Sequence, residues 1–106
     1  MSGAKEPLSD IVDRARDALK SVMDPEAGLN IVDLGLVYDV AVENGRLVAV
    51  ITFTTEACPV GPRLAREAEH ALGAVAGPLP VEIRVTFDPP WTPERITPDG
   101  RALLGR

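Results

Sequence analysis

The sequence has one cysteine, few aromatic residues and no long apolar run, and each scarcity excludes a class of protein. A single cysteine, Cys58, rules out an internal disulfide framework. No apolar stretch approaches the roughly 20 residues that a membrane-spanning helix needs. The segment Met1 to Pro7 is polar and no apolar signal segment follows it, so we expect a cytoplasmic protein whose lone thiol stays reduced.

Basic residues are also scarce, because 11 Lys and Arg face 16 Asp and Glu, which gives a formal net charge of −5. Such a chain is poorly suited to nucleic acid, since phosphate binding needs clustered positive charge. The sequence contains no phosphate-cradling glycine-rich loop, no dinucleotide fingerprint and no Gly-x-Ser-x-Gly elbow. It also lacks the paired-cysteine spacing of zinc sites. These absences disfavour a nucleotide-dependent enzyme, a serine hydrolase and a zinc finger.

What is present fits one domain over residues 9–106, preceded by a flexible leader at 1–8. Apolar residues recur at three- and four-residue steps from Ile11 to Val22, which predicts a helix capped by Ser9 or Asp10. Asn44-Gly45 is a turn typical of hairpins. The remaining predictions are a loop at 24–35, strands at 36–43, 46–54 and 81–87, and helices at 62–75 and 98–104.

The predicted order is helix, strand, strand, helix, strand, followed by a short C-terminal helix. The simplest arrangement is a two-layer α/β (α+β) fold, with both longer helices on one face of a three-stranded mixed sheet. The third strand is expected to run parallel to the second, because a helical crossover joins them. The pattern of 46–54 does not decide which face is inside, since both faces are apolar.

Cys58 is the candidate functional residue, because it lies between a predicted strand and a predicted helix. The first N–H groups of a helix are unpaired and form the positive end of its dipole, which stabilises a nearby thiolate. Thr54 and Thr55 supply hydroxyl groups, Pro59 fixes the backbone after the thiol and Gly61 allows an open turn. A metal-binding or nucleophilic sulfur would suit this arrangement. The alternative is a buried cysteine that acts as a small apolar residue.

Other polar residues in the loops are supporting candidates, each with a structural alternative. Asp24 and Glu26 would orient a partner or accept a hydrogen bond, although Asp-Pro also stops helices and Glu26 would equally serve as a solvated charge. Asp33 would brace its own loop through backbone N–H groups. Trp91 is either a lid packed on the core or, if exposed, a binding platform. We assign no role to His70, which lies in a predicted helix.

Four short motifs follow one another along the chain: Asp24-Pro25-Glu26, Ile31 to Tyr38, Thr54 to Pro59, and Asp88 to Pro93. Their order and separations resemble those of the SufT/PaaD-like domain family, whose members are labelled metal–sulfur cluster biosynthetic proteins. The resemblance extends over about residues 9–104. Each motif is short, but the set of four is specific.

The resemblance implies a small two-layer α/β domain that acts in iron–sulfur cluster assembly or in the maturation of iron–sulfur proteins. Cys58 matches the family's reactive or metal-linked cysteine. Asp24 and the segment Asp33 to Gly35 are expected to gather near it. Common clusters take four ligands, mostly cysteine thiolates. One chain with one thiolate is therefore expected to hold iron or a cluster only transiently, completed by a second copy, a partner or a small thiol.

Three classes of function stay open. The first is an assembly or maturation factor, with Cys58 as transient ligand or reactive thiol, working with the assembly machinery or a client metalloprotein. The alternative is a non-catalytic adaptor that docks such a client, with Cys58 structural. An enzyme would need a base near the thiol, and the only histidine lies twelve residues further along, so we expect an accessory protein. We expect no nucleic acid or membrane partner, and a homodimer paired along a sheet edge.

Overall fold

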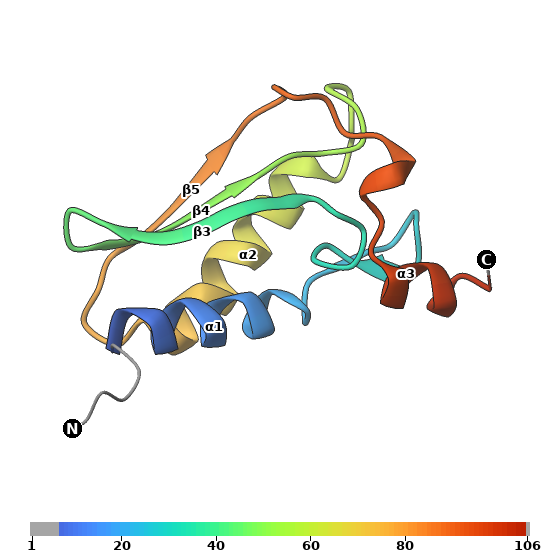
Figure 1. Ribbon diagram of the computed structural model, residues 1–106. Helices are drawn as coiled ribbons and strands as arrows, with labels where there is room; N and C mark the ends of the chain where they lie inside the picture. The colour runs from blue at the N-terminus through green and yellow to red at the C-terminus, as the bar shows by residue number, and fades with distance from the viewer. Residues whose placement is uncertain (1–6, 106) are drawn as a thin grey trace.

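Two helices pack side by side against one face of a sheet in the computed structural model, which describes residues 7–105 (Figure 1). Helix α1 is Pro7–Leu19 and helix α2 is Gly61–Ala76. Each helix buries one apolar stripe at three- and four-residue steps, as an amphipathic helix on a core does. The buried positions include Ala15 and Leu19 in α1 and Leu64, Ala68 and Leu72 in α2. The predicted two-layer arrangement is confirmed.

The sheet contains β3 (Val37–Glu43), β4 (Arg46–Ile51) and β5 (Val81–Val85), with β4 in the middle. Strands β3 and β4 are antiparallel and are joined by Asn44 and Gly45, whose φ angles of 52° and 76° suit a hairpin turn. Strand β5 runs parallel to β4, from Leu47 opposite Val81 to Ile51 opposite Val85. The crossover through α2 makes this parallel pairing possible, and the predicted mixed sheet is confirmed.

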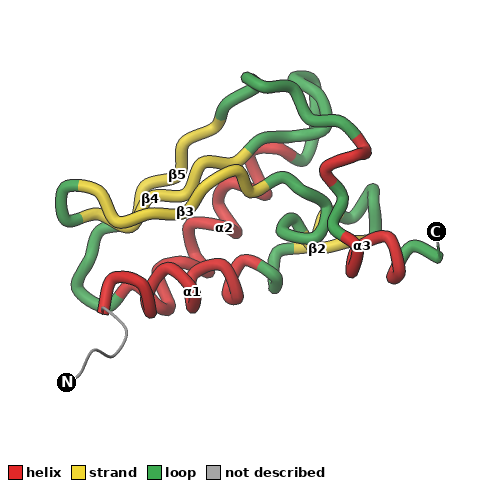
Figure 2. Tube along the Cα trace, in the orientation of Figure 1, coloured by secondary structure: helices red, strands yellow, loops and turns green. Residues whose placement is uncertain are grey.

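The segment predicted as a loop at 24–35 contains a second, two-stranded sheet, so that prediction is wrong in part (Figure 2). Strand β1 (Met23–Asp24) pairs antiparallel with β2 (Leu29–Asn30). Gly28, with φ of +69°, lies in the turn that joins the two strands. Leu29, Ile31 and Leu34 are buried in the core. Strands of two residues are too short to show a period of two in the sequence.

Several element ends differ from the predicted ones. Helix α1 begins at Pro7, before the predicted caps, and stops at Leu19, after which three-residue hydrogen-bonded turns lead to Val22. Strand β4 ends at Ile51 and β5 at Val85, both earlier than predicted. Residues 1–6 of the predicted leader lie outside the described residues. After β5 come the 3-10 helix η1 (Pro93–Arg95) and helix α3 (Pro98–Leu103), close to its predicted position.

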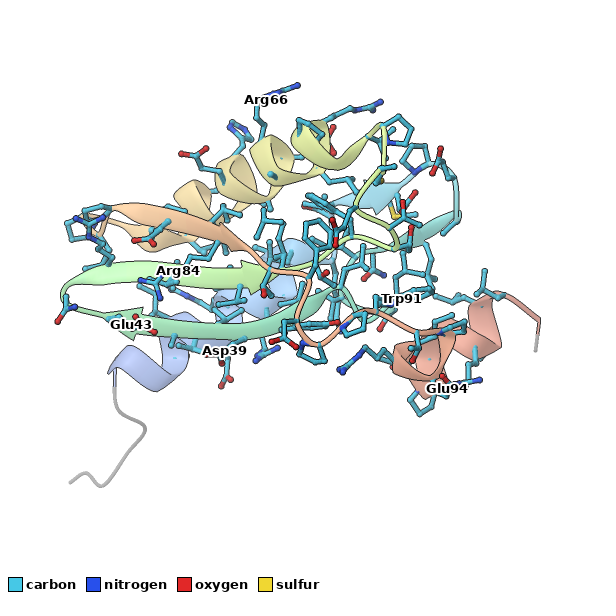
Figure 3. The ribbon with its side chains drawn as sticks, turned by 90° about the horizontal axis from the view of Figure 1, so that it is seen from above. Asp39, Glu43, Arg66, Arg84, Trp91 and Glu94 are labelled. Carbon is cyan, nitrogen blue, oxygen red and sulfur yellow. The ribbon has the colours of Figure 1, made fainter. Side chains whose placement is uncertain are left out.

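The second face of the sheet carries ion pairs, and no helix within residues 7–105 covers it (Figure 3). Arg84 pairs with Glu43 at 3.1 Å and also with Glu82, which Arg46 approaches to 3.4 Å. The Arg84 guanidinium donates a hydrogen bond that holds the pKa of the Glu82 carboxyl below its ordinary value of 4.5. Val48, opposite Glu82 in register, is only 1% exposed, as expected where long charged side chains cover an apolar residue.

Across residues 7–105, every helix is too short or too polar to cross a bilayer.

Candidate functional site

The segments that carry the four sequence motifs, residues 24–26, 31–38, 54–59 and 88–93, meet at one end of the domain, which we call the functional end (Figures 1 and 2). Strand β3 begins at this end, β4 and β5 finish there, and α2 starts there. The Thr52 N–H donates to Leu36 O at 2.8 Å, which joins the loop after β4 to the segment before β3. The rings of Phe53 and Phe87 lie 6.0 Å apart, which joins the same loop to the segment after β5. The fold therefore brings three distant stretches of sequence together.

Cys58 lies in the loop between β4 and α2, three residues before the helix begins, and is half-buried. Its N–H donates to Thr55 O at 3.3 Å and its carbonyl accepts from Gly61 N–H at 3.2 Å. Two successive turns thus fix the backbone on either side of the thiol. Thr54 is half-buried and Thr55 is exposed. Among the described residues, Cys58 makes hydrogen bonds only through its backbone.

Helix α2 starts without a side-chain cap. Val60 occupies the N-cap position, and its carbonyl accepts from Leu64 N–H at 2.9 Å. Pro62 lies in the first turn, where a missing N–H costs the helix nothing. This start agrees with the predicted setting of Cys58 just ahead of a helix. Backbone carbonyls of Cys58 and Val60, rather than a capping hydroxyl, accept from N–H groups of the first turn.

Asp24 is buried and has a structural task. Its Oδ1 accepts hydrogen bonds from the N–H of Glu26 at 2.8 Å and of Ala27 at 3.3 Å. Gly28 N–H then donates to Asp24 O at 2.9 Å, which closes the turn between β1 and β2. Glu26 is exposed. The Asp-Pro-Glu motif therefore builds a tight hairpin at the functional end, and a role of Asp24 or Glu26 toward a partner stays a prediction.

Asp33 is also buried, but it does not brace its loop through backbone N–H groups as predicted. Its carboxylate accepts from Asn30 Nδ2 at 2.9 Å and from Thr97 Oγ1 at 3.0 Å. The Thr97 hydroxyl in turn accepts from Gly100 N–H and caps α3. Sequence reasoning missed Asn30 and Thr97. The only available signal was Thr97-Pro98, a typical start of a helix.

Trp91 lies half-buried where the C-terminal segment crosses the functional end (Figure 3). Its indole N–H donates to Leu34 O at 2.8 Å, and the ring packs against the core. Tyr38 holds the same segment, because its hydroxyl donates to Pro89 O at 2.8 Å. Of the two interpretations of Trp91, these contacts favour the lid over the binding platform.

The described residues offer few donors for a metal. Across residues 7–105, no three His, Cys, Asp or Glu side chains are grouped closely enough to hold a metal ion. A cluster of a common type takes four ligands, and this chain supplies one thiolate.

Several known proteins are similar to this chain in sequence. Residues 13–85 match the family described as "Iron-sulfur cluster assembly protein". The chain is 37% identical over 89 residues to the Fe-S protein maturation auxiliary factor YitW of Bacillus subtilis, covering 83% of this chain and 87% of YitW. It is 34% identical over 85 residues to the Fe-S protein maturation auxiliary factor SufT of Staphylococcus aureus, covering 79% and 97%.

The fold has a close counterpart among solved structures. A domain of unknown function from Bacillus anthracis superposes with a TM-score of 0.84 at 31% identity, covering 92% of this chain and 94% of that one. The resemblance predicted from the four motifs is thus confirmed for both sequence and fold. The chain belongs to the iron–sulfur cluster assembly protein family.

Proposed function

We propose that this protein is an accessory factor in the assembly or maturation of iron–sulfur proteins, with Cys58 as a transient ligand or reactive thiol for iron or a cluster. The family match and the names of the relatives support the assembly role. One observation supports the choice of Cys58. It is half-buried, and its backbone is held by turns on both sides, at the end of the domain where the motif segments meet.

The number of ligands shapes the rest of the proposal. One thiolate leaves about three further ligands to be found for a cluster of a common type. A homodimer would supply a second Cys58, and the assembly machinery, the client protein or a small thiol would supply the remainder. The cargo then passes through the site without being stored there. We place this activity in the cytoplasm, where a lone thiol stays reduced.

The test is an anaerobic activation assay of an iron–sulfur client, combined with alkylation of Cys58. Ferrous iron is expected to slow the reaction of Cys58 with iodoacetamide. Cys58→Ala is expected to lose client activation, whereas Glu56→Gln, an exposed change in the same loop, keeps it. Circular dichroism checks that both variants fold. Two results together would remove Cys58 from the mechanism: full client activation by Cys58→Ala, and no protection of Cys58 by iron in the wild type.

The second candidate is an adaptor that docks a client metalloprotein without handling metal. Asp24, Asp33 and Trp91 favour this candidate. Each of these side chains already has a hydrogen-bond partner inside the fold, so together they help to build a fixed surface. An adaptor predicts client binding that is unchanged in Cys58→Ala and alkylation that is insensitive to iron. A pull-down of the client with both proteins anaerobic separates the two candidates.

We also propose the homodimer. Strands β3 and β5 are the outer strands of the three-stranded sheet, and an outer strand offers unpaired backbone groups to a second copy. Light scattering after size exclusion is expected to give twice the chain mass. A monomer mass at the concentrations used in the activation assay would mean that all further ligands come from other molecules.

A further inference from the structure

A cavity of about 500 Å³ lies beside the functional end, between α1, the start of β3 and the C-terminal segment. Val32, Val37 and Pro89 give it an apolar wall, and the Tyr38 ring adds an aromatic one. Arg16 reaches it from α1 and Arg95 from η1. This volume lies within the range of small-molecule sites, which combine apolar walls with a few polar groups.

The charge of the cavity is opposite to that of the protein. Two guanidinium groups line it, and no acidic side chain among the described residues does so, although the chain carries a net charge of −5. Within residues 7–105, neither Arg16 nor Arg95 forms an ion pair, as is also true of Arg66 and Arg101.

Asp33, the acidic residue next in sequence to the lining residue Val32, is hydrogen-bonded to a second lining residue, Thr97. Its carboxylate accepts from Asn30 and Thr97 and does not line the cavity. The positive charge at the cavity is therefore not balanced by a lining carboxylate.

Arg95 is held in place rather than free to swing. Its guanidinium carbon lies 4.6 Å from the centre of the Tyr38 ring, and the Tyr38 hydroxyl is anchored to Pro89 O. Its backbone is seated against Gly35, where even a Cβ would have no room. A guanidinium stacked on a ring keeps its N–H donors directed outward in its own plane. That geometry suits two parallel hydrogen bonds to a carboxylate or a phosphate.

We propose that this cavity binds a small organic anion that carries carboxylate or phosphate groups, with Arg16 and Arg95 as its anchors. The apolar wall and the Tyr38 ring contact the body of the molecule. The proposal does not depend on the role of Cys58, because none of the lining residues lies in the loop 52–60. Two arginines at one place suit a small anion better than an extended acidic segment of a protein partner, which would need positive charge along its length.

The test is calorimetric titration of the whole chain with citrate, with inorganic phosphate and with a hexaglutamate peptide. We expect citrate or phosphate to bind. Tighter binding of citrate would indicate a carboxylate ligand, and tighter binding of phosphate would indicate a phosphate ligand. Arg16→Gln and Arg95→Gln are each expected to weaken binding about tenfold or more, since each removes charged hydrogen bonds. Arg66→Gln is the matched control, because Arg66 is an exposed arginine that does not line this cavity (Figure 3).

Two further measurements test whether the anion binds at this cavity. Arg95→Lys retains the charge but not the planar fork, so it should bind more weakly than the wild type. Affinity should also fall as sodium chloride is raised, because partly exposed charges are screened by salt. Fluorescence of Trp91 reports whether the C-terminal segment stays in place in each variant.

Three outcomes would overturn the proposal. One is the absence of binding for both small anions, and another is binding that the Arg16 and Arg95 variants leave unchanged. The third is tight binding of hexaglutamate alone, which would make the cavity part of a protein-docking surface. None of these outcomes bears on client activation, so the failure of this proposal and the failure of the assembly role are distinguishable.

Discussion

Replacing Gly35 with alanine tests how firmly the C-terminal segment is seated on the functional end. Gly35 has φ of +85°, in the left-handed region that favours glycine. A Cβ at this position would overlap the carbonyl oxygen of Arg95 and lie 2.7 Å from its carbonyl carbon. The backbone at 95 cannot rotate away as a flexible side chain would. Gly35→Ala should therefore displace the segment that carries Trp91, Arg95 and α3.

The magnitude follows from two separate costs. An alanine in the left-handed conformation costs about 1–2 kcal/mol. Forcing packed groups apart costs about 1–3 kcal/mol more. We expect Gly35→Ala to lower the free energy of unfolding by about 2–5 kcal/mol. Gly45→Ala is the matched control, since Gly45 has φ of +76° but nothing within 4 Å of its Cβ position, so it should lose only about 1–2 kcal/mol.

Urea unfolding, followed by Trp91 fluorescence and by circular dichroism, measures the free energy of unfolding of both variants. The chain has one tryptophan, so its fluorescence reports on the C-terminal segment alone. In Gly35→Ala we expect the fluorescence transition to precede the loss of helical signal, whereas in Gly45→Ala the two should coincide. The effect of a glycine substitution on the unfolded chain is similar for both variants and cancels in the comparison. Equal stabilities, within about 0.5 kcal/mol, would refute the reasoning.

Three other predictions follow from contacts within the fold. Leu72→Ala should lower the free energy of unfolding by about 2–5 kcal/mol in urea, because Leu72 is fully buried; a loss under 1 kcal/mol would contradict its place in the core. Thr97→Val should cost about 1–3 kcal/mol in the same assay, since it removes the α3 cap and a hydrogen bond to Asp33; its cost should shrink in an Asp33→Ala background. Glu82 has a lowered pKa, so its ion pair stabilises the fold above pH 4.5 and is lost as the pH falls below that value. The melting temperature of wild type should therefore exceed that of Glu82→Gln at pH 6, and the gap should narrow as the pH falls below 4.5.

The sequence was enough to predict the parts of the fold that have a period or a local turn signal. Apolar spacing located α1 and α2, and alternation located β5. Asn44-Gly45 fixed the hairpin, and the helix between β4 and β5 required them to be parallel. These features are either local in the sequence or follow from the handedness and length of the connection between two strands. One sequence is therefore sufficient to find them.

The rest depends on contacts between residues far apart in the chain. Thr97 is hydrogen-bonded to Asp33, 64 positions away in the sequence, and Trp91 to Leu34, 57 positions away. No local sequence pattern predicts either pair. Strands β1 and β2 were missed because two residues carry no period. Val48 made both faces of β4 look alike, since it is buried although it lies outside the main core cluster.

The side-chain partners separate two kinds of motif residue. Asp24, Asp33 and Trp91 each satisfy a hydrogen bond that holds a turn, a helix or a segment in place. Cys58 differs, because its backbone is fixed while its thiol forms no hydrogen bond with any described residue. Loss of activity in an Asp33 variant would therefore be hard to distinguish from loss of shape. At Cys58, chemistry and stability should separate, which makes it the informative position for deciding between an assembly factor and an adaptor.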